Sequence, residues 1–373
     1  MPGTTVRQQT LMQAKRIVVK IGTNTLCHEG GGINRQAVSM LAGQIASVRK
    51  RGVAVTLVAS GAIGTGLAAL EMSRRPKTMP MLQAVAAVGQ GKLMRVFQNA
   101  FARRGIRVGQ VLLTREDFED RTRYLNIRNT LASLAECDAL PIINENDTVA
   151  VDEIRFGDND VLAALVTNML AADLLVFLTN VDGVLRGRQV LDVIEQVDDE
   201  AIALAGPQKS SLGSGGMASK LEAAGLVVRA GEAAVIANAA TPNVLRRLLD
   251  GEPLGTVFVP ARRKMSSRRR WIGQATRPAG RLVVDDGAAR ALERSGKSLL
   301  PSGITEVKGS FEKGAVVAVV DSAGREVARG LTNYSSQQVE RIKGLKTRQI
   351  AQVLGDKPYD EVIHRNNMSL TGG

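Results

Sequence analysis

Short apolar runs alternate with longer amphipathic stretches along the first 260 residues. The apolar runs predict six strands, at Arg16–Ile21, Val53–Ala59, Arg107–Leu113, Leu140–Asn144, Leu174–Thr179 and Ala233–Ala237. Apolar residues that recur every three or four positions predict six helices, at Asn34–Arg51, Met81–Arg104, Tyr124–Glu136, Asp160–Leu170, Met217–Ala230 and Thr241–Asp250. Strands that alternate with helices form parallel βαβ units in a sheet covered on both faces. The pattern therefore predicts an α/β fold, a three-layer α/β/α sandwich with a mostly parallel central sheet.

The pattern changes after residue 260. Residues 261–279 are dense in Arg and predict a basic linker. Beyond them, glycine turns separate short β-rich runs at Arg281–Val284, Ala315–Val320 and Glu326–Gly330, with one helix near Gly287–Ser295. Such spacing predicts a small, mostly β domain. We expect a main domain at 1–260, the linker at 261–279, the small domain at 280–360 and a tail at 361–373.

Composition limits the class of protein. Aromatic residues make up only 3% of the chain, and the two cysteines, Cys27 and Cys137, cannot form a disulfide framework. We therefore expect a reducing, cytoplasmic location. The uncharged run Val53–Leu70 is broken midway by glycines, so it predicts a strand, a turn and a helix start, with no membrane association.

The net charge of +13 is unevenly distributed, since residues 261–373 contain 21 Lys and Arg against 11 Asp and Glu. A basic region of this kind is typical of nucleic-acid binding, and equally of a well-solvated surface. RNA binding by the small domain therefore stays open as an alternative.

Two glycine–lysine segments, distant in sequence, indicate a site for a polyphosphate. Lys20 lies at the end of the first predicted strand and Gly22 follows it, while Gly213–Lys220 runs from a glycine-rich loop into a helix. Glycines let backbone N–H groups approach an anion, and lysine adds a full charge. Neither segment has the Walker spacing: the one Gly-Lys-Ser, at Gly296, has Ala291 where that motif needs glycine.

Amides and carboxylates gather after the predicted strands, in Asn144–Asp147 and Gly157–Asp160, while Ser60 follows the second strand. In parallel sheets, ligands bind beyond the carboxyl ends of the strands. Asn and Asp also favour turns and helix N-caps, so each residue alone fits a structural role equally well. Their concentration at one predicted edge favours a binding site for a cationic amine, for Mg²⁺ or for the lysines.

Other chemistries fit poorly. The only histidines are His28 and His364, so neither a Ser–His–Asp triad nor a zinc site is convincing. Gly64–Ala69 matches the loose dinucleotide fingerprint, but the acidic residue expected about twenty positions later is absent. A dinucleotide oxidoreductase is therefore disfavoured.

Seven motifs occur in the order and spacing of a known family, in a resemblance that covers residues 15–260. They are Lys20-Ile21-Gly22-Thr23, Val58-Ala59-Ser60-Gly61-Ala62-Ile63-Gly64, Gly109-Gln110-Val111-Leu112-Leu113-Thr114, Ile143-Asn144-Glu145-Asn146-Asp147, Phe156-Gly157-Asp158-Asn159-Asp160, Leu178-Thr179-Asn180-Val181-Asp182-Gly183 and Gly213-Ser214-Gly215-Gly216-Met217-Ala218-Ser219-Lys220. The chain thereby resembles the glutamate 5-kinases of the amino-acid kinase superfamily. Segments beginning at Asp285, Ser298 and Gly309 resemble the PUA module that many bacterial members carry.

The resemblance implies ATP-dependent phosphorylation of the L-glutamate side-chain carboxylate, the step that begins proline synthesis. It implies that Lys20 and Lys220 contact the transferring phosphate and that Asp160 organises both lysines, which makes these three the catalytic residues. It implies that Ser60, Asp147 and Asn159 bind glutamate. The residues implied to bind ATP are Lys20, Gly22, Thr179, Asn180, Ser214, Gly215, Gly216, Met217, Ala218, Ser219 and Lys220.

The resemblance also implies Mg²⁺ as a cofactor, a homo-oligomer (a dimer or tetramer) and feedback inhibition by proline. The chain departs from many relatives at Asn180, where aspartate is common, and at Ser214, which is often threonine. The alternatives are another amino-acid kinase, acting on acetylglutamate, aspartate or carbamate, and an RNA-binding protein.

Overall fold

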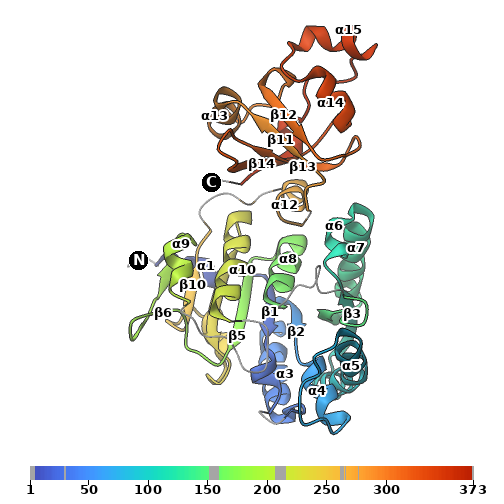
Figure 1. The fold of residues 1–373 in the computed structure, drawn as a ribbon. Coiled ribbons are helices and arrows are strands. Elements are labelled where there is room, and N and C mark those ends of the chain that lie inside the picture. The colour runs from blue at the N-terminus through green and yellow to red at the C-terminus, as the bar shows by residue number, and fades with distance from the viewer. Residues whose placement is uncertain are drawn as a thin grey trace. The chain divides into compact units, whose positions relative to one another are not determined.

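The chain divides into two units, residues 1–264 and 265–373, each with its own sheet (Figure 1). In the computed structural model, the described residues are 5–28, 31–150, 159–205, 216–260, 264, 266–275 and 277–371. None of the helices in these residues is long and apolar enough to cross a lipid bilayer.

Eight strands form the sheet of the first unit, in the order β3-β4-β2-β1-β5-β9-β10-β8. Their bounds are β1 Arg16–Ile21, β2 Ala54–Ala59, β3 Arg107–Leu113, β4 Ala139–Glu145, β5 Leu174–Thr179, β8 Val193–Ile194, β9 Ala233–Asn238 and β10 Thr256–Phe258. Only the β9–β10 pair is antiparallel. A separate hairpin joins β6 (Leu185–Arg186) to β7 (Gln189–Val190). The predicted mostly parallel sheet is confirmed.

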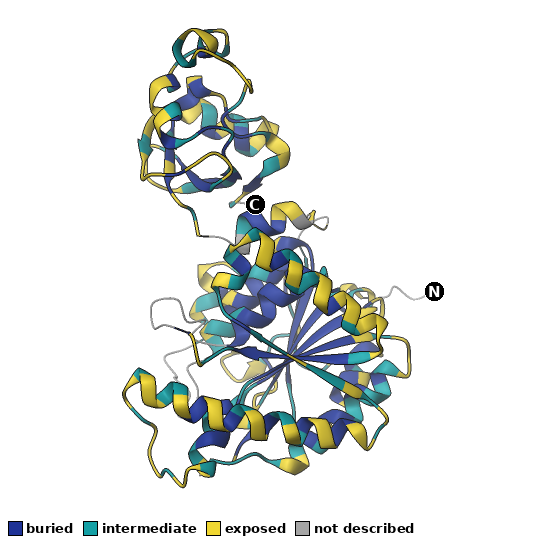
Figure 2. Cartoon of the chain, turned by 90° about the vertical axis from the view of Figure 1, so that its right-hand side faces the viewer, coloured by how far each residue is buried: buried dark blue, intermediate teal, exposed yellow. Residues whose placement is uncertain are grey.

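Helices cover both faces of this sheet (Figure 2). The described helices of the unit are α1 Val6–Met12, α2 Thr23–Leu26, α3 Arg35–Arg49, α4 Ala62–Ala69, α5 Met79–Ala102, α6 Glu116–Glu119, α7 Arg121–Glu136, α8 Asn159–Leu170, α9 Asp199–Ala203, α10 Met217–Ala230 and α11 Val244–Leu249. Six of these helices follow the predicted ranges closely and α4 follows the predicted helix start, whereas α1, α2, α6 and α9 are additions that the apolar pattern did not predict.

Alternation along β1 divides its side chains between the two faces. Ile17, Val19 and Ile21 join the buried cluster formed with α3, α5 and α11. Successive side chains of a strand point to opposite faces, so Val18 and Lys20 point to the other side. On that side, α8 packs on β1 and α10 packs on both α8 and β9. A lysine is thereby buried beneath two helices.

The second unit contains a five-stranded sheet in the order β12-β11-β13-β14-β15. Its strands are β11 Arg281–Val284, β12 Ile304–Lys308, β13 Val316–Val320, β14 Glu326–Leu331 and β15 Met368–Leu370. Its described helices are α12 Ser267–Arg270, a π-helix at Trp271–Ala275, α13 Asp286–Ser295, α14 Ser336–Ile342 and α15 Ile350–Leu354, with single 3₁₀ turns at Pro301–Gly303, Thr347–Gln349 and Arg365–Asn367.

Two segments of this unit are more regular than the sequence pattern indicated. Residues 267–275, within the expected linker, are helical, and β15, within the expected tail, pairs with β14. Met368 is buried in the core of the unit. A strand of three residues is too short to produce a recognisable alternation, so only its pairing with β14 reveals it.

Candidate functional site

The site lies at the carboxyl edge of the large sheet, where parallel strands end together. The chain builds the sheet from β1 through β2 in one direction and then from β5 through β9 in the other. In such sheets the crevice opens where the strand order reverses. The reversal is at β1 and β5, so Lys20 and Thr179, near the ends of these strands, lie beside it.

Two lysines meet on one buried carboxylate. Lys20 Nζ lies 2.5 Å from Asp160 Oδ1, and Lys220 Nζ lies 3.0 Å from Asp160 Oδ2. The side chain of Asp160 is fully buried, while those of Lys20 and Lys220 are 4% and 11% exposed. Since Asp160 belongs to α8, Lys220 to α10 and Lys20 to β1, the packing of both helices on one face of the sheet creates this contact.

The electrostatics of this cluster favour an anion. Two ammonium groups converge on the two oxygens of one buried carboxylate, so positive charge is concentrated at this point of the site. Asp160 lies in the first turn of α8, where the helix dipole stabilises negative charge. Lys220 lies in the first turn of α10, where the dipole and free backbone N–H groups attract anions. These features together favour the binding of a phosphate group beside the lysines.

A hydrogen-bonded chain of amides adjoins the lysines. The Asn159 Nδ2 group donates to the Ala59 carbonyl at 3.0 Å, to Ser60 Oγ at 3.0 Å and to Asn144 Oδ1 at 2.8 Å. Asn144 Nδ2 in turn donates to Gln90 Oε1 at 2.8 Å. The chain ties the ends of β2 and β4 to α8 and α5. It therefore holds Ser60 and Asn159 in fixed positions.

Asp147 lies half-buried on the turn after β4. Its neighbours Glu145 and Asn146 line a pocket of about 340 Å³, together with Arg115 and Arg123. The sequence analysis singled out neither arginine. The rule that polar side chains after strand ends gather at one edge would have pointed to Arg115, which follows β3 closely.

The residues expected to contact the nucleotide lie along the same edge. Thr179 ends β5, and its hydroxyl donates to Asn180 Oδ1 at 3.3 Å. Gly22 directly follows β1, and a Cβ at this position would lie 3.7 Å from Lys20 Nζ. Gly216 caps α10, whose first turn contains Met217, Ala218, Ser219 and Lys220. Ser214 and Gly215 lie outside the described residues, as do Gly157 and Asp158.

A second pocket of about 340 Å³ opens at the ends of β5 and β9. Asp182 and Asn238 form part of its lining and are joined by a hydrogen bond of 2.8 Å from Asn238 Nδ2 to Asp182 Oδ1. Leu254 and Gly255 form another part of the lining. Sequence analysis missed this pocket, because Leu254 and Gly255 reach it only through the pairing of β10 with β9.

Of the two cysteines, Cys27 is buried and Cys137 is exposed. Cys27 is buried against Gly61, and desolvation raises the pKa of its thiol to about 11, although a hydrogen bond with Thr65 acts in the opposite direction. Within the described ranges, no three His, Cys, Asp or Glu side chains converge as metal ligands.

Comparisons with known proteins agree with the two-unit organisation. The amino acid kinase family matches residues 15–238, and the PUA domain matches residues 280–354. A glutamate 5-kinase of Caldanaerobacter subterraneus subsp. tengcongensis is 49% identical over 360 residues, which cover 95% of this chain and 97% of that protein. A glutamate 5-kinase of Citrifermentans bemidjiense is 46% identical over 372 residues, which cover 98% of this chain and 100% of that protein.

Among solved structures, a carbamate kinase from Giardia is similar with a TM-score of 0.50 and 19% sequence identity. The similarity covers 66% of this chain and 99% of that chain. At this identity the likeness concerns the fold alone.

Proposed function

Because the chain belongs to the amino acid kinase family, and within it to the glutamate 5-kinases, we propose that it phosphorylates L-glutamate with ATP. One oxygen of the glutamate side-chain carboxylate bonds to the γ-phosphorus of ATP, and the bond from that phosphorus to the β–γ bridging oxygen breaks. The products are glutamyl 5-phosphate, which begins proline synthesis, and ADP. The observation that carries the proposal is the pair of lysines on buried Asp160.

The chemistry needs charge stabilisation and no general base. A glutamate carboxyl has a pKa near ~4.3 in solution, so the attacking oxygen is already ionised at neutral pH. The obstacle is the approach of two anions. Lys20 and Lys220 supply positive charge at the transferring phosphoryl group, and buried placement keeps water from weakening it.

We assign the remaining groups by their position around the lysines. Asp160 holds both ammonium groups toward one point. Ser60 and Asn159, joined by a hydrogen bond beside Asp160, bind glutamate together with Asp147, whose carboxylate suits the α-ammonium group. The groups that bind ATP are Gly22, Thr179, Asn180 and the segment Ser214–Lys220, of which Ser214 and Gly215 lie outside the described residues.

Mg²⁺ fits this site as an ion that binds together with the nucleotide. The described residues form no cluster of three metal-ligating side chains, and both oxygens of Asp160 face lysines. Mg²⁺ often binds through substrate phosphates and water with few protein ligands. When bound, it would neutralise phosphate charge, while Lys20 and Lys220 supply positive charge at the transferring group.

The RNA-binding alternative is not favoured. Recognition of single-stranded RNA relies on exposed aromatic platforms. In the second unit Trp271, Phe311 and Tyr334 are buried, and only Tyr359 is exposed among the aromatic residues. Kinases of acetylglutamate, aspartate or carbamate are likewise not favoured, since the full-length relatives are glutamate 5-kinases.

Family membership also leads us to propose a homo-oligomer and feedback inhibition by proline. Light scattering of the purified protein would give the oligomeric state. Titration of glutamate turnover with proline would measure the inhibition, and turnover that does not respond to proline would contradict this second part.

The activity is tested with the purified full-length protein. ADP release is followed with glutamate, acetylglutamate, aspartate or carbamate as acceptor, and hydroxylamine traps the acyl phosphate as a hydroxamate. We expect ADP release and hydroxamate formation with glutamate and Mg²⁺. ADP release that glutamate does not stimulate, or faster release with another acceptor, would overturn the assignment.

A further inference from the structure

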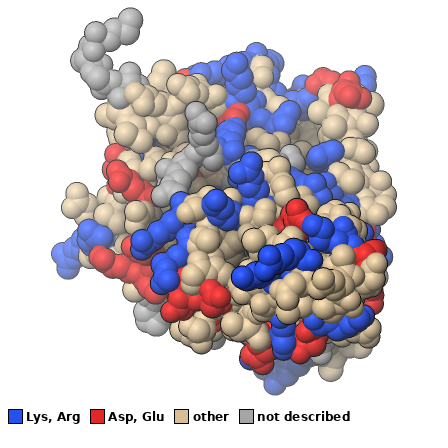
Figure 3. Space-filling model, turned by 90° about the horizontal axis from the view of Figure 1, so that it is seen from above, with Lys and Arg blue, Asp and Glu red and all other residues tan. Residues whose placement is uncertain are grey.

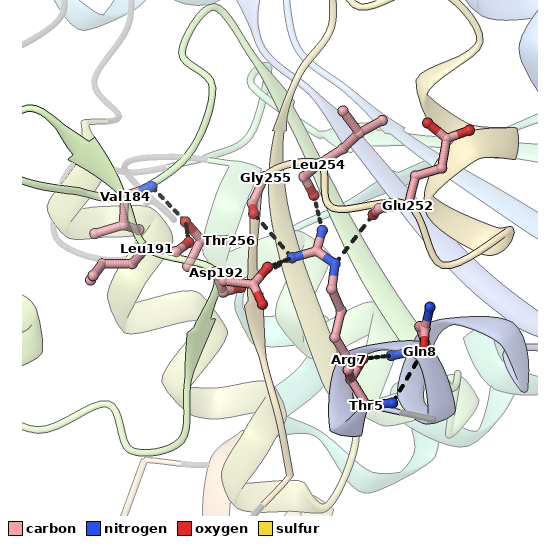
Figure 4. Close-up of polar contacts among 10 residues, drawn as sticks. All are labelled: Thr5, Arg7, Gln8, Val184, Leu191, Asp192, Glu252, Leu254, Gly255 and Thr256. Atoms are coloured by element: carbon pink, nitrogen blue, oxygen red, sulfur yellow. Dashed lines mark hydrogen bonds and ion pairs between the residues drawn. The ribbon is translucent and has the colours of Figure 1, made fainter. Parts of the chain in front are cut away.

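A buried arginine of the N-terminal helix binds two distant segments of the first unit (Figure 4). Arg7 belongs to α1 and is 3% exposed. Its Nη1 group forms an ion pair with the Asp192 carboxylate and donates to the Asp192 carbonyl at 3.1 Å and to the Gly255 carbonyl at 3.3 Å. Nε donates to the Glu252 carbonyl at 3.2 Å, and Nη2 donates to the Leu254 carbonyl. All three nitrogens of the guanidinium are engaged.

These acceptors belong to two segments that lie far apart in the chain and have hydrogen bonds of their own, such as that from the Val257 amide to the Asp192 carbonyl at 2.9 Å. Glu252, Leu254 and Gly255 form the connection from α11 to β10, and Asp192 precedes β8. Buried carbonyl groups without donors are costly, and the fork of an arginine satisfies several at once. Arg7 therefore fixes the connection and the start of β8 against each other.

The connection is also packed tightly on the sheet. Gly255 has a φ of +72°, and a Cβ there would lie 2.2 Å from the Ile236 carbonyl oxygen. Beside it, Thr256 Oγ1 accepts a hydrogen bond from the Val184 amide at 2.8 Å and donates to the Leu191 carbonyl at 2.7 Å. Arg7 thus completes a network that joins α1, the β6–β7 hairpin region and β10.

Arg7's partners Asp192, Leu254 and Gly255 line the pocket at the ends of β5 and β9. Asp182 and Val190 line it as well. The carboxylates of Asp182 and Asp192, the second of them paired with Arg7, can accept hydrogen bonds from the hydroxyl groups of a ribose, and the apolar side chains of Val190 and Leu254 suit a base. The lysine cluster, by contrast, attracts phosphate. Both the pocket and the cluster lie at the carboxyl edge of the sheet, as the two ends of ATP require.

We propose that Arg7 is a positioning residue for nucleotide binding, which holds the wall of a pocket for the adenosine part of ATP. The inference rests on the proposed use of ATP and adds a residue that does not itself touch the nucleotide. Loss of Arg7 should weaken the binding of ligands that contain adenosine. It should leave the binding of ligands that contain only phosphates unchanged.

The test compares Arg7→Met and Arg7→Lys with the wild-type full-length protein. Calorimetry measures the binding of ADP and of inorganic tripolyphosphate, and kinetics give the KM for ATP and for glutamate. Arg49→Met is the matched control, because Arg49 also pairs with a carboxylate and a carbonyl, both of Asp138, away from either pocket.

We expect Arg7→Met to weaken ADP binding and raise the KM for ATP by at least about fivefold, with tripolyphosphate binding and the KM for glutamate within about twofold of wild type. Arg7→Lys should lie between, since lysine keeps the charge and loses the fork. Arg49→Met should leave all four values unchanged. If Arg7→Met does not fold, Arg7→Lys provides the same comparison.

Unchanged ADP affinity in the folded variants would overturn the proposal and leave Arg7 a purely structural role. Equal weakening of ADP and tripolyphosphate would also overturn it, because the effect would then not be confined to the adenosine pocket. A wild-type protein that binds ADP without phosphorylating glutamate would refute the proposed function alone, and the comparison of variants would still decide the role of Arg7.

Discussion

Lys20 and Lys220 are separated by two hundred residues of chain and share one carboxylate. Each lysine taken alone resembles an ordinary surface residue at the end of a strand or the start of a helix. Burial changes their chemistry, because a charge removed from water interacts more strongly with whatever anion reaches it. The two side chains are 4% and 11% exposed, so little water is present to weaken their interaction with an anion.

We predict that Lys220→Ala lowers kcat about a hundredfold or more, with little change in the KM for glutamate, because the charge acts on the moving phosphoryl group. Steady-state kinetics with glutamate as the varied substrate measure both values. Lys264→Ala is the control, since Lys264 is an exposed lysine of the same unit paired with Asp173 at 2.6 Å. An unchanged kcat in Lys220→Ala would remove this residue from the mechanism.

The thiol of Cys27 gives a prediction of pH dependence. Its pKa is about 11 in the folded protein against 9.0 as an ordinary thiol, so between these values only the unfolded chain ionises. Ionisation of the unfolded chain therefore lowers the free energy of unfolding as the pH rises from 9 to 11, by up to about 1.4 kcal/mol per unit.

Urea unfolding of wild type and Cys27→Ala at pH 8 and pH 10 measures this effect. The variant should lose less stability between the two pH values than wild type. In the native protein at pH 8, iodoacetamide should label exposed Cys137 and spare Cys27. Rapid labelling of Cys27 would contradict its burial.

At the scale of secondary structure, two closely packed helices support the segment that contains Ser60. Helices α4 and α5 pack against each other at two glycines, Gly66 and Gly89. A Cβ on Gly89 would lie 1.8 Å from the Ala62 carbonyl oxygen, and one on Gly66 would lie 1.9 Å from that of Val85. Since α4 begins just after Ser60, any separation of these helices would disturb the substrate side of the site.

We predict that Gly89→Ala destabilises the protein by about 3 kcal/mol, because its new methyl group must separate α4 from α5. Gly91→Ala is the matched control on the same helix, where a Cβ meets nothing within 4 Å. It should stabilise by up to about 1 kcal/mol, since alanine favours helix over glycine. Denaturant midpoints measure both changes, and equal midpoints for the two variants would be incompatible with the tight packing.

The elements themselves were predictable to different degrees. Strands such as β1 and β5, buried on both faces, produce apolar runs that determine their bounds almost to the residue. Strands β8 and β10 have only two and three residues and produce no pattern. Helix α1 did have a signal, because Thr5 and Gln8 form a capping box, which sequence analysis by apolar period overlooks.

At the scale of the whole molecule, the two units have separate cores. Every candidate catalytic and binding residue lies in residues 1–264, and the second unit has a core of its own around β11, β13 and β14. Basic and acidic side chains are interleaved on the face drawn in Figure 3. In the second unit, Arg325 pairs with Glu293 at 2.7 Å and Asp321 at 3.0 Å, and Arg329 pairs with Glu326 at 2.8 Å. Part of its excess basic charge is thus compensated locally.

We predict that a protein ending at residue 264 folds and keeps glutamate-dependent ADP release within about tenfold of the full chain, because its core and site are self-contained. Circular dichroism and the coupled assay measure folding and activity of both proteins. A folded but inactive truncated protein would show that the second unit contributes to catalysis.

The sequence by itself determined the chemistry available to this protein and most of its regular structure. Apolar periodicity follows from the burial of each strand and helix, and the seven motifs keep the residue types that a phosphoryl transfer needs. Such signals are local in the chain, so they identify the residues and leave their partners open.

Only the tertiary structure decided which of those residues meet. Asp160 joins Lys20 to Lys220 because α8 packs on the face of β1 from which Lys20 projects and α10 packs beside it on α8. No sequence motif contains Gln90 or Arg7. Their roles are visible only in the structure, where each side chain forms hydrogen bonds to segments far away in the chain. Long-range contacts depend on how whole elements pack, and no local pattern of apolar and polar residues encodes that packing.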